Sequence, residues 1–153
     1  MVSPSHTYRF RVRSRDRAGN VSAWVEGLLV KSALVQESST AISYRGTWYA
    51  GKSTSFSGGG VRWTQSSTAT ATYTVTGRGV ALVTTLAAGR GKLKVYVDGV
   101  YARTIDLYAS SASFRALAFS QMFAAYGTHT VKLVNVAPSG RPRADLDAFA
   151  VLR

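Results

Sequence analysis

Apolar and polar residues alternate along the first part of the chain. Tyr8, Phe10 and Val12 are separated by single arginines, and this period of two predicts a β-strand with one apolar and one cationic face. A turn is predicted at residues 18–20, and residues 21–30 predict a second strand. Two strands cannot form a core of their own, so either the segment belongs to a longer multidomain protein or the strands pair with something else.

The rest of the chain shows a denser pattern of short alternating runs separated by Gly- and Ser-rich clusters. Nine strands are predicted, at residues 40–49, 60–64, 69–76, 79–87, 91–97, 100–107, 113–119, 128–136 and 145–152. Asp98-Gly99 is the clearest link, because this dipeptide between alternating runs favours a two-residue hairpin turn. Strands of this number and spacing predict an all-β fold, an antiparallel β-sandwich of the jelly-roll type.

The first segment resembles the C-terminal end of a fibronectin type III domain. The resemblance rests on the pattern Y-x-F-x-V-R-x-x-D-x-A-G-N-x-S-x-W, which runs from Tyr8 to Trp24. It covers only the last two strands of that fold. We therefore expect a partial fibronectin type III-like segment at residues 1–36 and a jelly-roll domain at residues 37–153.

The second segment resembles the small jelly-roll modules appended to bacterial extracellular glycoside hydrolases, esterases and proteases. These are galactose-binding-like β-sandwiches, and a fibronectin type III domain often precedes them. The resemblance is carried, in this order, by Tyr44 to Trp48, Ser57 to Gly59, Tyr73 to Gly77, Gly91 to Gly99, Gly127 to Val131 and Asp145 to Val151. It implies a secreted, non-catalytic accessory module that binds carbohydrate.

The charge balance is strongly basic. Nineteen Lys and Arg against seven Asp and Glu give a formal net charge of +12, which favours attraction to polyanions such as nucleic acid or acidic polysaccharide. No nucleic-acid motif accompanies the arginine row between Arg9 and Arg17, and Tyr8 and Phe10 point away from it. We therefore expect no nucleic-acid partner. No apolar run approaches the ~20 residues of a spanning helix, so membrane insertion is not expected either.

Few residues in the chain are suited to catalysis. Cysteine is absent, and His6 and His129 are the two histidines. A serine nucleophile would have to use His129, but no G-x-S-x-G elbow accompanies it. His129 shares the strand parity of Val131 and Leu133, which predicts an inward-facing, structural side chain at the rim of the sandwich. We expect no enzyme activity.

Three carboxylates are candidates for a structural calcium site. Asp147 has the parity of the core residues Phe149 and Val151, and a carboxylate that enters a core needs a partner. That partner is Arg45, His129, a backbone amide or a cation. The jelly-roll resemblance implies that acidic residues on the first and last strands hold calcium. Calcium ligands would then be Glu37, Asp145 and Asp147; the alternative for the acidic pair is a salt bridge or a turn cap.

The Asp98-Gly99 hairpin offers a candidate ligand face. A two-residue turn places Tyr96 opposite Tyr101 and Lys94 opposite Arg103, all four on the outer face. Exposed aromatic rings can stack on sugar rings, and opposed cations favour a carboxylate between them. A solvated sheet face is the alternative interpretation.

A second candidate lies near the Gly-rich loop at residues 57–60. Trp63 follows Arg62 directly after this loop, and the loops at the end of a sandwich often carry ligands. We expect Trp48 in the core. Arg115 is expected to pair with Asp106.

The leading hypothesis is an extracellular accessory module that binds polysaccharide or a cell-surface glycan. The alternative is a structural or assembly protein that uses open strand edges for subunit contacts, as a homo-oligomer through the N-terminal strands, a filament or a coat. A third hypothesis is a surface that binds polyanions in general.

Overall fold

A computed structural model describes residues 6–153 as an all-β protein in which the one helical element is a short 3-10 turn. Residues 1–5, the start of the predicted first segment, lie outside the described residues. The elements in chain order are β1 (Thr7–Val12), β2 (Val25–Gln36), β3 (Ile42–Arg45), β4 (Tyr49–Lys52), η1 (Ser57–Gly59), β5 (Gly60–Thr64), β6 (Thr70–Leu86), β7 (Lys92–Val97), β8 (Val100–Asp106), β9 (Ser113–Asn135), β10 (Ala144–Leu146) and β11 (Ala148–Leu152).

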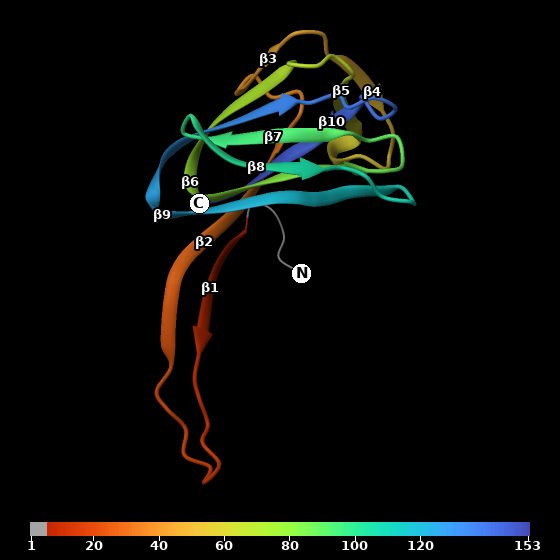
Figure 1. The fold of residues 1–153 in the computed structure, drawn as a ribbon. Coiled ribbons are helices and arrows are strands. Elements are labelled where there is room, and N and C mark those ends of the chain that lie inside the picture. The colour runs from red at the N-terminus through yellow and green to blue at the C-terminus, as the bar shows by residue number, and fades with distance from the viewer. Residues whose placement is uncertain (1–5) are drawn as a thin grey trace.

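The strands form a large sheet with the order β1-β2-β11-β6-β9-β7-β8, which β3 joins by pairing with β6. This sheet folds over on itself (Figure 1). Its first layer holds β3, the start of β6, the end of β9, β7 and β8. Its second layer holds β2, β11, the end of β6 and the start of β9. A small sheet of β10, β5 and β4 closes one end. The predicted antiparallel sandwich is confirmed.

Both β6 and β9 pass through the two layers without a break. The sequence pattern predicted a separate strand on either side of each bend, but Gly77 pairs with Gly127 at the bend and the register shifts before Gly79. Glycines and local register shifts let a strand turn sharply while its ladder continues. The strands predicted at 69–76 and 79–87, and at 113–119 and 128–136, are therefore the two halves of β6 and β9.

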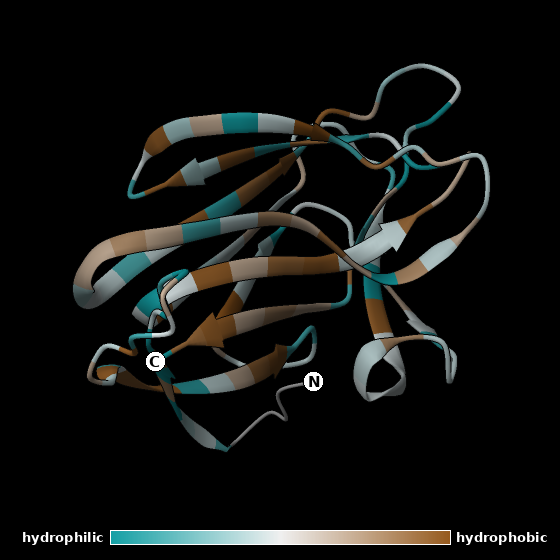
Figure 2. Cartoon of the chain, turned by 90° about the horizontal axis from the view of Figure 1, so that it is seen from below, coloured by the Kyte–Doolittle hydropathy of each residue, from teal (hydrophilic) through white to brown (hydrophobic). Residues whose placement is uncertain are grey.

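The core lies between the two layers. Tyr73 of the first layer stacks on Phe149 of the second, with ring centroids 4.9 Å apart. Buried aliphatic residues such as Leu82, Leu93 and Leu133 surround this pair. Hydrophobic and hydrophilic residues alternate along many of the strands (Figure 2), as expected for strands with one side toward the core and one side toward solvent. Trp48 packs against the core, as predicted.

A ribbon formed by β1 and the first part of β2 projects away from the sandwich (Figure 1). β2 then continues into the second layer, where Ser32 to Gln36 pair with β11. The segment predicted at residues 1–36 thus shares a sheet with the segment at 37–153. The fibronectin type III resemblance of the ribbon stays a prediction. No helix in the described part of the chain has the length and apolar character needed to cross a bilayer.

A side chain at Gly77 should destabilise the fold. A Cβ atom there would lie 2.5 Å from the backbone carbonyl oxygen of Leu152, so Gly77→Ala must push β11 away from β6, at a cost of about 1–3 kcal/mol. Gly89→Ala is the matched control, because its Cβ would meet nothing within 4 Å. Urea unfolding of both variants tests this. Equal midpoints for the two variants would contradict it.

Candidate functional site

The β7–β8 hairpin is held against β9 by the carboxylate of Asp98. Asp98 and Gly99 have φ values of 50° and 79° between paired Val97 and Val100, which confirms the predicted two-residue turn. The Asp98 carboxylate accepts hydrogen bonds of 2.7 Å from Nδ1 of His129 and from the Thr130 amide. These two bonds, that of His129 foremost, lower the pKa of Asp98.

His129 has a structural place at the rim. Its ring stacks on Phe123 with centroids 3.6 Å apart, while Nδ1 contacts Asp98. It pairs across the sheet with the buried Val75. This agrees with the inward orientation predicted from strand parity.

Two tyrosines and two lysines lie together on the outer, solvent-facing side of the first layer. Tyr96 pairs with Tyr101 of β8 on one side and with Lys132 of β9 on the other. The tyrosine rings meet edge to face with centroids 5.7 Å apart. Lys94 lies one row along, between Val134 and Thr104. We call Tyr96, Tyr101, Lys94 and Lys132 the tyrosine–lysine face.

The tyrosine–lysine face is hollowed and carries unpaired positive charge. A hollow of about 300 Å³ is lined by Tyr96, Gly99, Lys132 and Val134. Among the described residues, no carboxylate forms an ion pair with Lys94 or Lys132. Cationic donors beside half-exposed rings can hydrogen-bond the hydroxyl or carboxylate oxygens of a sugar while its C–H face packs on an aromatic ring.

The structure corrects the position of Arg103. The prediction placed it opposite Lys94, but Lys94 pairs with Thr104, and Arg103 pairs with Val95. The register shifts because β8 has one extra residue between Tyr101 and Arg103. This bulge turns Arg103 to the other face of the sheet, where its guanidinium lies 5.2 Å from the Phe119 ring. Arg103 is therefore not a member of the tyrosine–lysine face.

Lys132 is the member of this face that sequence reasoning missed. It belongs to β9, far along the chain from the Asp98-Gly99 hairpin. Only the pairing of β7 with β9 brings it beside Tyr96. The alternation in β9 indicates that Lys132 points away from the core, but nothing local indicates which strand lies next to it.

Trp63 and Arg62 lie on opposite faces of the small sheet. The Trp63 ring stacks on the Tyr49 ring, with centroids 4.5 Å apart, and the Arg143 guanidinium also lies 4.5 Å from its centroid. The Trp63 indole is thus already in contact with two other side chains of the protein. The outer member of this stack is Tyr49, whose side chain is exposed. Trp63 is consequently poorly placed as a stacking platform for a ligand.

Arg62 lines a separate hollow of about 490 Å³ together with Glu37, Lys52 and the loop at Gly58–Gly60. Its guanidinium lies 5.4 Å from the Tyr44 ring. The Tyr44 hydroxyl donates to the backbone carbonyl of Glu37 at 2.7 Å, and burial raises the pKa of Tyr44. The two halves of the predicted ligand set, the hairpin residues and Arg62, therefore belong to different surfaces.

The three predicted calcium ligands do not form one group. Both carboxylate oxygens of Asp145 are occupied, one by Arg90 at 2.6 Å and the other by Arg143 at 2.7 Å. Asp145 is fully buried and serves as the shared partner of two arginines, because a buried carboxylate without such partners would be strongly disfavoured. This corrects its assignment as a ligand. No cluster of three metal-binding side chains occurs within residues 6–153.

Glu37 and Asp147 do lie close together beside the loop of η1. The amide of Ser57 donates to the Asp147 carboxylate, at 2.9 and 3.1 Å to its two oxygens. Of the partners predicted for Asp147, a backbone amide is therefore present. Desolvation raises the pKa of Asp147 to about 6, and the negative charge of Glu37 adds to the effect. Calcium binding by Glu37 and Asp147 stays a prediction.

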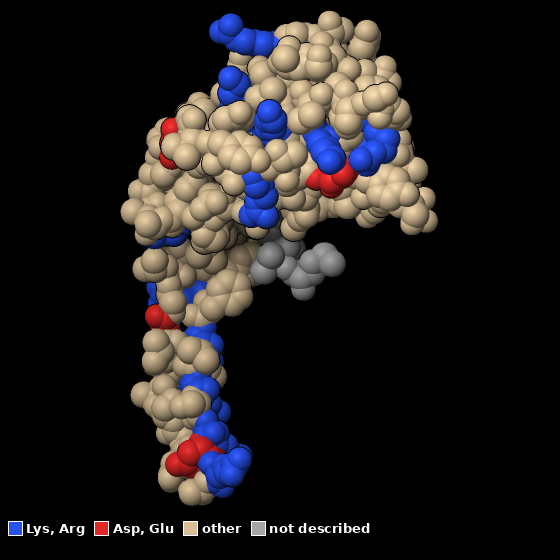
Figure 3. Space-filling model, in the orientation of Figure 1, with Lys and Arg blue, Asp and Glu red and all other residues tan. Residues whose placement is uncertain are grey.

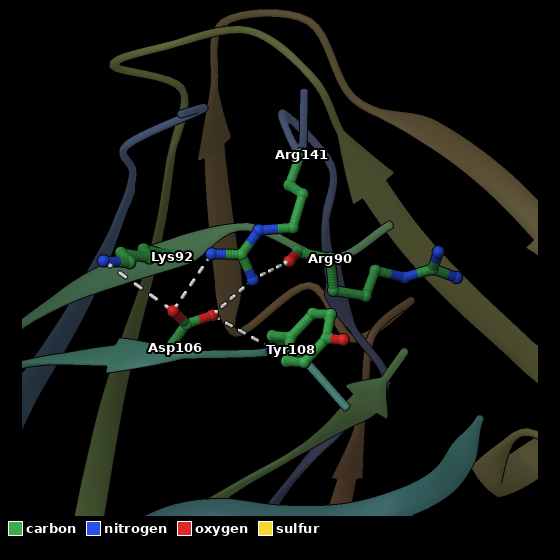
Figure 4. A network of polar contacts seen from close by, with 5 residues as sticks. All are labelled: Arg90, Lys92, Asp106, Tyr108 and Arg141. Atoms are coloured by element: carbon green, nitrogen blue, oxygen red, sulfur yellow. Dashed lines mark hydrogen bonds and ion pairs between the residues drawn. The ribbon is translucent and has the colours of Figure 1, made fainter. Parts of the chain in front are cut away.

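An ion-pair network ties the loop at residues 137–143 to β7 and β8 (Figure 4). Arg141 donates to both oxygens of Asp106, at 2.9 and 3.1 Å, and Lys92 lies 3.7 Å from the same carboxylate. The hydrogen bonds from Arg141 lower the pKa of Asp106. The expected pairing of Asp106 with Arg115 is wrong. Arg115 instead donates to the backbone carbonyls of residues 54–56 and so fixes the loop that precedes η1.

Comparisons with known proteins agree with a β-sandwich of the jelly-roll type. No family model matches the chain. An A type blood N-acetyl-alpha-D-galactosamine deacetylase from Flavonifractor plautii is 30% identical over 104 residues, which are 68% of this chain and 13% of that protein. The chain thus spans about an eighth of the curated relative's length.

Two solved structures have the same fold at low sequence identity. A family 35 carbohydrate binding module from an environmental isolate matches with a TM-score of 0.58 and 17% identity, over 78% of this chain and 95% of the other. A two-domain esterase active on acetylated mannans matches with a TM-score of 0.63 and 14% identity, over 80% of this chain and 36% of the other. These likenesses show the jelly-roll fold.

The raised pKa of Asp147 predicts a specific pH dependence of stability. The folded state holds the Asp147 proton more tightly than the unfolded state, so this stabilisation is full below about pH 4 and is lost as the pH rises through about 6. Asp147→Asn keeps an acceptor for the Ser57 amide and cannot ionise. Relative to the wild type, the variant should therefore gain stability between pH 4.5 and pH 7.5 in urea unfolding.

Asp106→Asn is the control for this measurement. The pKa of Asp106 is lowered, so its titration in both states falls below the window used. The difference between Asp106→Asn and the wild type should stay nearly constant from pH 4.5 to pH 7.5. A constant difference for Asp147→Asn as well would rule out the proposed titration.

Proposed function

We propose that this protein is a non-catalytic, secreted module that binds polysaccharide or cell-surface glycan through the tyrosine–lysine face. The observation that carries the proposal is the pairing of Tyr96 with Tyr101 on a sheet face beside two lysines that form no ion pair with any carboxylate of residues 6–153. The likeness to a family 35 carbohydrate binding module over almost the whole of that module supports it. The similar sequence in the deacetylase and the similar fold in the esterase are each part of a larger protein that acts on carbohydrate, which also supports the proposal.

The chemistry of the face favours an acidic glycan. Lys94 and Lys132 flank Tyr96 on neighbouring strands, and like charges this close repel one another unless an anion lies between them. A uronic acid carboxylate between the lysines would relieve that repulsion. The sugar ring attached to it would then lie over the tyrosine rings.

Tyr96→Ala should weaken glycan binding by about five- to thirtyfold, because a stacked aromatic ring contributes roughly 1–2 kcal/mol to a contact of this kind. Tyr101→Ala should have a similar effect. Tyr126→Ala is the control. Tyr126 and Tyr101 are both 53% exposed, but Tyr126 lies outside the proposed face. Affinity electrophoresis in acidic and neutral polysaccharides measures all three. An equal loss in all three variants would overturn the assignment of the face.

The two lysines should set the preference for acidic over neutral glycans. Lys94→Gln and Lys132→Gln should each reduce retardation by an acidic polysaccharide and leave any retardation by a neutral one unchanged. Lys52→Gln, in the separate hollow beside Arg62, is the control. If Lys52→Gln alone abolishes binding, the ligand occupies that hollow instead.

Calcium at Glu37 and Asp147 has its own test. A bound cation would oppose protonation of Asp147, so calcium should raise the melting temperature at pH 7.5 more than at pH 5. Glu37→Gln should remove this calcium response, whereas Glu26→Gln, on the exposed ribbon, should keep it. An unchanged melting temperature in the presence of calcium or a chelator at pH 7.5 would contradict calcium binding.

A further inference from the structure

The outer face of the second layer is mostly apolar, with Ser32 and Ser120 among its members, and it continues onto the ribbon. Cross-strand pairing aligns Leu34 with Ala150 and Ala81, and Leu152 with Gly79 and Met122. Along β2 the same face continues through Ser32 and Val30 to Leu28. A register shift between the Arg9 and Arg11 pairs then brings Val25 onto it, opposite Val12. We call this surface the apolar face; its members are Phe10, Val12, Val25, Leu28, Val30, Leu34, Gly79, Ala81, Met122, Ala150 and Leu152.

Large side chains stand out from the apolar face on the ribbon. Phe10 is 60% exposed, Leu28 63% and Val25 66%. On the sandwich the face is lined by small residues instead, and a hollow of about 240 Å³ lies over Gly79, Ala81 and neighbouring strand residues. Contiguous exposed apolar surface of this kind marks an interaction site in a soluble protein.

The cations of the ribbon lie on its other face. Arg9 pairs across the ribbon with Leu29, and Arg11 with Glu26. Arg11 and Arg13 both stack on the Trp24 ring, at 4.4 and 4.6 Å from its centroid. Figure 3 shows cationic side chains along the length of the ribbon. The apolar face therefore offers an approach that brings no cation rows together, although the chain carries a net charge of +12.

We propose that two copies of this chain associate through their apolar faces about a two-fold axis. The ribbon of each copy lies across the hollow of its partner, with Phe10 and Leu28 packed over Gly79 and Ala81. The face is self-complementary, because it presents protruding residues on the ribbon and a hollow on the sandwich. A two-fold interface uses the same patch twice, so each protruding set meets the hollow of the other copy.

Edge-to-edge pairing of two β1 strands is another arrangement that the topology offers, because β1 is one edge strand of the large sheet. It would place the arginine rows of both copies side by side on one face, which like-charge repulsion disfavours. It would also leave the apolar face uncovered. Face-to-face packing avoids both costs.

Leu28 and Leu29 provide a matched pair for the test. They are adjacent, 63% and 56% exposed, and they point to opposite faces of the ribbon. In sedimentation velocity at concentrations of about 10–100 µM, the wild type should sediment as a dimer. Leu28→Glu and Met122→Glu should weaken association at least tenfold, and Leu29→Glu should remain dimeric.

Cysteine crosslinking tests the geometry, since the chain has no cysteine of its own. Phe10→Cys combined with Ala81→Cys should give a disulfide-linked dimer under mild oxidation. Leu29→Cys combined with Ala81→Cys should not, because Leu29 faces away.

Three outcomes would overturn the proposal. A wild type that stays monomeric throughout the concentration range excludes a second copy as the occupant of this face. Equal effects of Leu28→Glu and Leu29→Glu exclude face-specific contact. Dissociation by Leu28→Glu without any effect of Met122→Glu excludes the packing of the ribbon over the sandwich.

Discussion

β6 and β9 pair from Thr70 to Leu86 across both layers of the sandwich, and the rest of the structure depends on this one ladder. Because the two strands bend together at Gly77 and Gly127, one continuous ladder supplies the centre of both layers. β7 then adds to β9 on one layer, and β11 adds to β6 on the other. The positions of the tyrosine–lysine face and of the apolar face follow from these two additions.

Alternation in the sequence predicted most of the strands, because each strand has one buried and one exposed side. The bends were not predictable in this way, since a glycine at a turn and a glycine at a continuous bend look alike along the chain. What distinguishes Gly77 is the carbonyl oxygen of Leu152, which leaves no room for a side chain and comes from the far end of the sequence.

The candidate site was predictable where it depended on the hairpin alone. The Asp98-Gly99 turn fixes Tyr96 opposite Tyr101, as expected. Two residues further along, the bulge in β8 reverses Arg103, and no local signal marks that bulge. The prediction of Trp63 as a ligand-stacking residue has a related difficulty. Tyr49 of β4 and Arg143, which directly precedes β10, both contact its ring. The sequence therefore predicted the local geometry of the hairpin, but it did not predict contacts between segments that are distant along the chain.

The cations behind the net charge of +12 fall into two groups, those in ion pairs within the fold and those without such a pair on its surface. Arg90, Arg143 and Arg141 are committed to the carboxylates of Asp145 and Asp106. Lys94 and Lys132 are left on the outer face of the first layer, and the apolar face is the outer face of the second. Two copies joined through their second layers would therefore present two tyrosine–lysine faces directed away from each other. If both faces reach one polysaccharide, the second contact becomes intramolecular, and avidity rises with no new contact in either site. Weak individual binding at a shallow sheet face is then compatible with firm attachment to a polymer that repeats its acidic units.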